Sequence, residues 1–256
     1  MSIKAQPATE GRVGDARCAP GVLLLLAPLF LIACHRQPAA PSATDFPAAQ
    51  RPVAPLSQSS VSEEQSRDLA GEAEAVMAFS DVGPGMTVAD IGAGEGYYTI
   101  RLARKVGAKG RVLAEDIVAA ARDALAQRVE REQLDNVSVK LGEEDNPELP
   151  VNSFNRVFMV NMYHEIRQPY AFLWHLRPSL VQGGQVVVVD AERPVSEHGI
   201  PPRLLICEFA AVGYRRTLFR ELPESDAYMV MFQPVGERPA PQQISPCRER
   251  TPGGTL

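Results

Sequence analysis

Long apolar runs, paired cysteines and basic stretches are scarce in this chain of 256 residues, and each scarcity argues against a class of protein. The most apolar run, residues 21–33, is too short to span a bilayer as a helix. Without a C-x-x-C pair a zinc or redox motif is disfavoured, and we expect no bound metal. A net charge of −5 with no basic cluster disfavours nucleic acid, whose binding depends on Lys and Arg that neutralise phosphates. The remaining composition fits one globular domain with appendages.

The few cysteines present are Cys18, Cys34, Cys207 and Cys247. Cys207 lies in an apolar helical stretch, where it is most simply a small buried hydrophobic residue. The sequence leaves undecided whether a disulfide joins Cys207 to Cys247, because no feature of their spacing favours one. Cys18 falls in a segment that we expect to be removed, whereas Cys34 has a more specific context.

The beginning of the chain has the pattern of a bacterial signal peptide. Residues 21–33 form an uncharged core of the right length, and the run ends in Leu31-Ile-Ala-Cys34. This ending resembles a lipobox, in which cleavage precedes the cysteine and the cysteine is lipidated. The resemblance predicts a signal peptide over 1–33 and a membrane anchor through lipidated Cys34. His35, where an Asp would signal inner-membrane retention, favours the periplasmic face of the outer membrane. A chance apolar run on a cytoplasmic protein is the alternative.

Two further segments have the composition of appendages. Residues 34–62 are rich in Pro and Ala and bury too little apolar surface to offset their ordering entropy, so we expect a semi-extended tether. Residues 236–256 are rich in Pro, Gly and Gln, and we expect a disordered tail. The folded domain is therefore predicted over residues 63–235.

A glycine-rich turn near the start of this domain organises the rest of it. The apolar run 87–91 predicts a buried strand, and residues 98–106 predict a helix. Between them stand three glycines at a spacing of two: Gly92, Gly94 and Gly96. Strand, glycine turn and helix open a doubly wound α/β fold, whose ligands lie beyond the carboxyl ends of the strands. The spacing differs from the G-x-G-x-x-G of dinucleotide sites. Asp90, just before the turn, is a poor neighbour for a pyrophosphate and a good one for a cation, which argues against an oxidoreductase.

At this motif the sequence resembles the class I S-adenosylmethionine (SAM)-dependent methyltransferases, whose first motif has the form D-x-G-x-G-x-G. SAM carries an ammonium and a sulfonium and no phosphate, which agrees with the charge of Asp90. Two later stretches also match: the turn Leu180-x-x-Gly183-Gly184 and the "N-x-Y-H-E" segment that begins at Asn161. The resemblance covers residues 63–235 and implies SAM as the cofactor.

The order of elements predicts an α/β, Rossmann-like three-layer sandwich, with a seven-stranded, mostly parallel sheet that ends in a C-terminal antiparallel hairpin. We expect strands at 87–91, 111–116, 137–141, 156–161, 186–190, 214–221 and 227–232. We expect helices at 63–79, 98–106, 119–133, 169–180 and 204–212. The loop 193–202 follows the fifth strand at the ligand end of the sheet and could form a lid.

The resemblance implies binding residues at the ends of the first four strands. Asp116 matches the acid that the family uses for the ribose, and Glu115 competes because alternation points only one of them at the ligand. Glu143 and Glu144 are alternatives for the adenine amino group, and a solvated acidic loop is an equal explanation. Asn161 ends the fourth strand and faces the cofactor. The complete predicted set is Asp90, Gly92, Ala93, Gly94, Gly96, Tyr97, Asp116, Ile117, Glu143, Glu144 and Asn161.

The predicted function is transfer of a methyl group from SAM to a small-molecule acceptor that the sequence does not identify. Such a displacement can proceed largely by positioning, and a general base helps only when the acceptor arrives protonated. Tyr163 and His164 are the candidates to meet the substrate, with packing as the alternative for a lone histidine. A lipid anchor would place the domain where SAM is not expected. The alternative function is therefore an inactive envelope lipoprotein that keeps the fold as a ligand-binding module.

Overall fold

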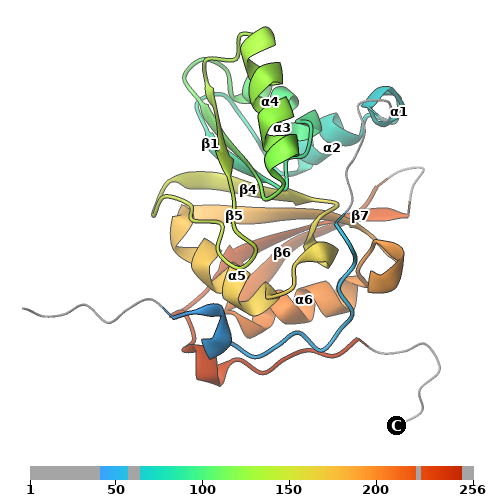
Figure 1. The fold of residues 1–256 in the computed structure, drawn as a ribbon, viewed down its shortest axis with the longest axis vertical. Coiled ribbons are helices and arrows are strands. Elements are labelled where there is room, and N and C mark those ends of the chain that lie inside the picture. Colours follow the sequence, from blue (N-terminus) through green and yellow to red (C-terminus); the bar gives the residue numbers. More distant parts are fainter. Residues whose placement is uncertain (1–40, 57–63, 223–225, 250–256) are drawn as a thin grey trace, which may run out of the picture. The chain divides into compact units, whose positions relative to one another are not determined.

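The computed structural model describes residues 41–56, 64–222 and 226–249 (Figure 1). The predicted signal peptide 1–33 and the predicted lipidation site Cys34 lie outside these residues. Among the helices of the described ranges, none combines the length and the apolar character needed to cross a membrane.

A single seven-stranded sheet forms the centre of the described chain, with the order β3-β2-β1-β4-β5-β7-β6. Its parallel strands are β1 (Thr87–Ile91), β2 (Arg111–Asp116), β3 (Val137–Leu141), β4 (Phe154–Val160) and β5 (Leu180–Ala191). The antiparallel end of the sheet is formed by β6 (Tyr214–Glu221) and β7 (Ala227–Pro234). The predicted fold class is confirmed. The strand order reverses between β1 and β4, the place where sheets of this kind bind ligands.

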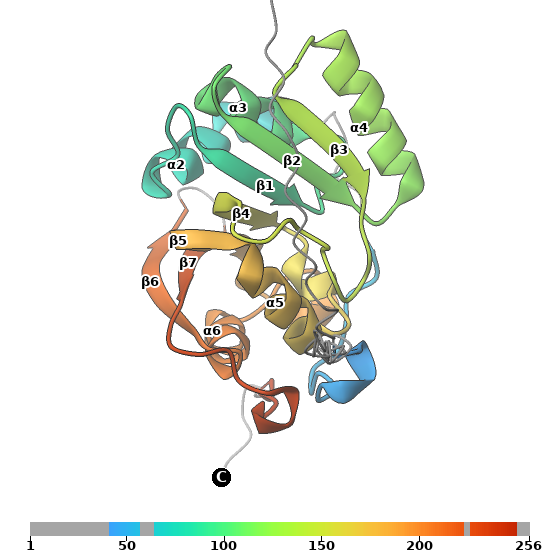
Figure 2. The ribbon, with the colours of Figure 1, turned by 90° about the vertical axis from the view of Figure 1, so that its left-hand side faces the viewer.

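Helices cover both faces of the sheet (Figures 1 and 2). One face carries α2 (Glu72–Phe79), α3 (Tyr97–Val106) and α4 (Ala119–Arg131), and the other carries α5 (Pro169–Leu176) and α6 (Pro202–Ala211). Because side chains alternate along a strand, the central strands contribute to both cores. Val88 packs with the α2–α3 side, whereas Ala89 and Ile91 pack with the α5–α6 side. This double burial explains the continuous apolar runs of the sequence.

The helix expected over 63–79 is two helices in the structure. They are α1 (Glu64–Leu69) and α2, and they are separated by Gly71, whose φ of 65° interrupts the helical path. A single helix over 63–79 would place Leu69 on one face with Ala73 and Val76, but Leu69 is 84% exposed, whereas those two side chains are buried. The helical period that placed Leu69 inward does not continue through the break.

The described part of the expected tether packs on the domain. Phe46 and Ala54 are buried, and Arg51 forms an ion pair with Glu208 at 2.9 Å in which both side chains are fully covered. The Arg51 guanidinium also donates to the backbone carbonyls of His164 and Ile166, at 3.3 and 3.2 Å. The tether prediction is wrong for residues 41–56, because a few specific contacts anchor a segment whose average composition is that of a linker.

The expected disordered tail is ordered as far as residue 249. It includes η6 (Pro241–Gln243), and Ile244 is buried. Cys247 is joined to Cys207 of α6 by a disulfide, the bridge that the sequence left undecided. Cys207 is exposed, so the expectation of a small buried hydrophobic residue is wrong. Arg248 donates to Gln50 at 2.6 Å, which places the tail beside the N-terminal segment (Figure 1). Residues 250–256 lie outside the described chain.

Candidate functional site

The glycine turn after β1 depends on backbone conformations that side chains disfavour. Gly92, Gly94 and Gly96 have φ values of 65°, 53° and 91°. A Cβ at Gly96 would lie 2.3 Å from Leu125 Cδ1 of α4, and one at Gly92 would lie 2.9 Å from Met162 Cγ. Among the described residues beyond its chain neighbours, none has an atom within 4 Å of a Cβ built at Gly94, so this position leaves open space beside the backbone. The turn thus lets helices pack closely on one side and leaves room for a ligand on the other.

One pocket lies where β1, β2, β3 and β4 end, at the reversal of the strand order. It brings together ten of the eleven predicted cofactor-binding residues: Asp90, Gly92, Ala93, Gly94, Tyr97, Asp116, Ile117, Glu143, Glu144 and Asn161. Gly96 is the exception, because it caps α3 and packs against Leu125 instead of lining the pocket. The ten predicted residues that share this cavity lie up to 71 positions apart in the sequence, from Asp90 to Asn161.

Asp90 is a buried carboxylate in the wall of this pocket. It is 2% exposed and accepts a hydrogen bond from Thr99 Oγ1 at 2.6 Å. Burial raises the pKa of Asp90 from 3.8 to about 6, because the charged form loses its hydration. At neutral pH Asp90 still carries its negative charge, and that charge favours a cationic ligand.

The two acids at the end of β2 have different environments, although both line the pocket. Asp116 accepts hydrogen bonds from the backbone N–H groups of Gly94 and Val118, each at 2.8 Å, so the glycine turn fixes its orientation. Glu115 is 1% exposed, and neither of its carboxylate oxygens has a hydrogen-bond partner among the described residues. Burial raises the pKa of Glu115 to about 8, and at neutral pH this side chain is mostly an uncharged acid.

The pocket also includes residues that sequence reasoning did not select. Glu64 and Arg67 come from α1, and residues 54–56 come from the N-terminal segment. Arg67 pairs with Glu72 at 2.7 Å, and its guanidinium carbon lies 3.8 Å from the centre of the Tyr97 ring. The sequence pattern predicted a helix over residues 63–79 and assigned it no contact with the pocket. It could not identify Arg67, because the contact with Tyr97 is made between separate elements.

Tyr163 and His164, the candidates to meet a substrate, lie outside the pocket lining. Tyr163 is fully buried and donates to Glu208 at 2.8 Å, so the structure does not place it to contact a ligand in the pocket. Burial raises the pKa of the Tyr163 hydroxyl well above its usual range. His164 is 2% exposed, and its Nδ1 lies 2.9 and 3.0 Å from the two carboxylate oxygens of Asp190. The suggested lid, residues 193–202, contributes no side chain to this pocket.

The comparisons with known proteins agree with this geometry. A family model described as a methyltransferase domain matches residues 88–184, which run from β1 into β5. A search of curated proteins found no significant match.

Solved structures show the same fold. A SAM-dependent methyltransferase from Aquifex aeolicus is 24% identical, with a TM-score of 0.63 over 70% of this chain and 100% of that one. The glycopeptide N-methyltransferase MtfA, solved with SAM, is 12% identical, with a TM-score of 0.55 over 64% of this chain and 87% of that one. The [4+2]-cyclase SpnF is 14% identical, with a TM-score of 0.57 over 65% and 82%. At these identities the likeness establishes the fold, and function has to be argued from the site.

Proposed function

We propose that this protein is a SAM-dependent methyltransferase acting on a small-molecule acceptor. The observation that carries the proposal is the convergence of ten predicted binding residues on one pocket at the reversal of the strand order. The match of residues 88–184 to a methyltransferase domain supports the same assignment.

The residues of the pocket fit the chemistry of this cofactor. Asp90 offers a buried negative charge to the cationic methionine end, and Asp116 offers carboxylate oxygens to the ribose hydroxyls. Glu143 or Glu144 can accept the adenine amino group. In the reaction, the S–CH₃ bond of SAM breaks while a bond from the methyl carbon to the acceptor forms. The acceptor proton passes to a base or to water, and S-adenosylhomocysteine leaves. The protein contributes positioning and exclusion of water.

The proposal is tested by a comparison of ligands that differ in charge. SAM and S-adenosylhomocysteine at 100 times their Kd should each stabilise the folded protein by about 2.7 kcal/mol, and NAD⁺ at the same concentration should have little effect. Asp116→Ala should weaken SAM binding at least tenfold because it removes the ribose acceptor, which lowers the stabilisation at the same SAM concentration to about 1.4 kcal/mol or less. Asp123→Ala, on the outer surface of α4, should leave it unchanged. Stabilisation by NAD⁺ in preference to SAM would refute the assignment.

A second candidate function is a ligand-binding envelope lipoprotein that transfers no methyl group. Two observations favour an exported protein: the lipobox-like end of residues 21–34, and the Cys207–Cys247 disulfide, a bond that persists mainly in oxidising compartments. The [4+2]-cyclase SpnF has the same fold, so the fold alone does not require methyl transfer.

Location and activity separate these two candidates. We expect the mature protein to begin at a lipidated Cys34 on the periplasmic face of the outer membrane, and Cys34→Ala to release it from membranes. Intact mass and fractionation measure both. A soluble wild-type protein that retains residues 1–33 would favour the cytoplasmic alternative. SAM binding without release of S-adenosylhomocysteine, across a panel of small hydroxyl, thiol and amine acceptors, would favour the binding module.

A further inference from the structure

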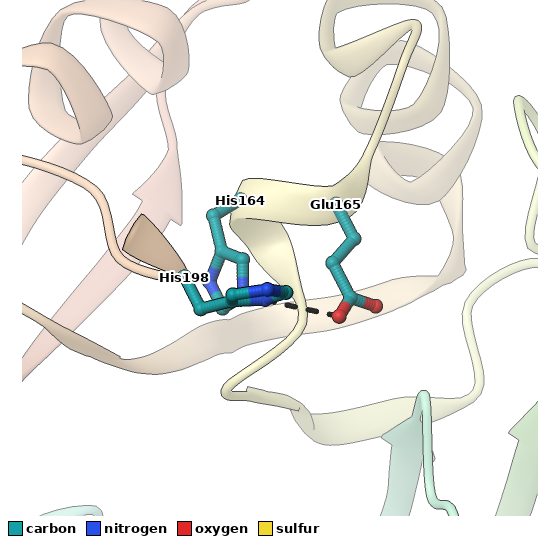
Figure 3. A group of neighbouring side chains, drawn as sticks. All are labelled: His164, Glu165 and His198. Atoms are coloured by element: carbon teal, nitrogen blue, oxygen red, sulfur yellow. Dashed lines mark ion pairs between the residues drawn. The ribbon is translucent and has the colours of Figure 1, made fainter. Parts of the chain in front are cut away.

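Two histidines and a glutamate meet beside the pocket (Figure 3). His164 and Glu165 belong to η3 (Tyr163–Glu165), which follows β4. His198 comes from the loop after β5, where it directly follows η5 (Val195–Glu197) in the sequence. One ligand atom from each of the three side chains lies within 4.8 Å of the other two. Figure 3 shows the three side chains converging from these two separate segments.

The imidazole of His164 forms its hydrogen bonds through Nδ1 and leaves Nε2 without a partner among the described residues. Asp190, which is fully buried, already accepts a hydrogen bond from the Ala191 N–H at 2.8 Å and lies against His164 Nδ1. We assign the imidazole proton to Nδ1, because a carboxylate accepts it there, and the lone pair is then on Nε2. Nε2 is buried and has no hydrogen-bond partner among the described residues, and Glu165 Oε1 lies 3.9 Å away.

His198 is held in place by a left-handed backbone. Its φ and ψ are both 54°, a conformation that residues with a side chain rarely adopt. The centres of the His198 and His164 rings are 5.7 Å apart, and the ring planes are nearly perpendicular. The loop therefore accepts backbone strain at the residue that completes the cluster, a pattern found at functional sites.

We propose that His164 Nε2, Glu165 and His198 bind a divalent transition-metal ion of the zinc type. Two imidazoles and one carboxylate are a usual protein ligand set for zinc, with a fourth position left open for water or substrate. Asp190 supplies the carboxylate that orients a ligating histidine and fixes its tautomer. Bonds of about 2.1 Å place tetrahedral ligand atoms roughly 3.4 Å apart, so the cluster closes on the ion through a small movement of Glu165 and His198.

The position of the ion assigns it a role in the reaction, and this step rests on the proposed methyl transfer. Glu165 lines the cofactor pocket, so an ion held by its carboxylate would lie beside that pocket. An acceptor with a hydroxyl or thiol group binds there through oxygen or sulfur, and the ion lowers the pKa of that group. The bound acceptor loses its proton to solvent and is then the nucleophile that a methyl transfer needs. Acceptors with such a metal-binding group are the substrate class that this site predicts.

The test measures metal binding by the tag-free full chain after removal of metal with a chelator. Titration with Zn²⁺ should show one equivalent bound per chain, and Co²⁺ should give the visible absorption of a tetrahedral site. His198→Ala and Glu165→Gln should each weaken Zn²⁺ binding at least tenfold. His175→Ala is the matched control and should leave it unchanged, because both ring nitrogens of His175 lie against backbone carbonyls, those of Asp145 and Pro41, away from the cluster. His198 lies in a loop, so its variant should fold like the wild type, which circular dichroism checks.

Separate readouts distinguish this inference from the proposed function. SAM binding by the His198→Ala variant should match that of the wild type, because His198 lies outside the pocket lining. Wild-type protein that binds no Zn²⁺ at micromolar concentration, or that binds it equally well without His198, overturns the metal site. Wild-type protein that binds Zn²⁺ but not SAM overturns the methyltransferase proposal and leaves the metal site standing.

Discussion

The buried charge of Asp90 predicts that SAM binding depends on pH in a specific way. Asp90 has a pKa of about 6, and a cationic ligand needs its ionised form. At pH 5 about one Asp90 side chain in eleven is ionised, so we expect SAM to bind roughly elevenfold more weakly than on the plateau above pH 7. Below pH 6 the affinity should fall about tenfold for each pH unit.

Asp90→Asn is the variant that isolates this charge. The amide oxygen can still accept the hydrogen bond from Thr99, so the local geometry is kept while the negative charge is removed. SAM should bind the Asn variant at least tenfold more weakly than the wild type at pH 7.5, with little change between pH 5 and 7.5. Isothermal titration calorimetry at several pH values measures both constants.

Asp90→Asn, which should weaken SAM binding, should have the opposite effect on the stability of the free protein and stabilise it at neutral pH. The pKa of Asp90 is raised from 3.8 to about 6, so the folded state favours the protonated carboxyl. That stabilising contribution is complete below about pH 4 and is lost as the pH rises through 6, by about 3 kcal/mol in total. Asp90→Asn should therefore be more stable than the wild type at pH 7.5 and about equally stable at pH 4 in urea unfolding. A wild-type affinity for SAM that is flat from pH 5 to 7.5, or an equally pH-dependent Asn variant, would refute the role of Asp90.

Three further predictions concern the framework around the pocket. Gly96→Ala should lower the free energy of unfolding by roughly 2–4 kcal/mol, because it combines a φ of 91° with a contact at 2.3 Å. Gly71→Ala, whose added Cβ comes within 4 Å of no atom of the described residues beyond its chain neighbours, should cost about 1 kcal/mol, and urea denaturation compares the two variants. Cys247→Ser should lower the free energy of unfolding by about 4 kcal/mol, the loop entropy of a bridge that spans 40 residues, and an unchanged urea midpoint would show that the disulfide does not form. Arg51→Met should destabilise the fold by about 3–5 kcal/mol because it leaves Glu208 buried without its cation, and the double variant with Glu208→Leu should recover part of the loss in thermal unfolding; no recovery would contradict the pairing.

The fold and most of the pocket follow from local sequence patterns. Residues 87–91 and the three glycines predict β1 and its turn because the signals lie next to one another in the chain. Asp116 and Asn161 could be placed because parallel strands bring their carboxyl ends to one edge of the sheet. These patterns locate a residue along its strand or helix. That position is sufficient to predict the residues of a site that lies at the ends of strands.

The errors arose where distant segments determine structure. The composition of residues 41–56 predicted a tether because it averages over the few side chains, such as Arg51 and Phe46, that dock on the domain. The sequence does not show that Cys207 pairs with Cys247, because a disulfide depends on whether the fold brings the two segments together. His164 and His198 are 34 residues apart with no metal-binding spacing, so only the packing of η3 against the loop after β5 reveals the cluster.

The most direct test of the central claim is a calorimetric titration of the wild-type chain with SAM at pH 7.5. The pocket predicts saturable binding of one SAM per chain, reduced at least tenfold in Asp116→Ala and unchanged in Asp123→Ala. Absence of binding at millimolar SAM, from a protein that unfolds cooperatively, would contradict the claim.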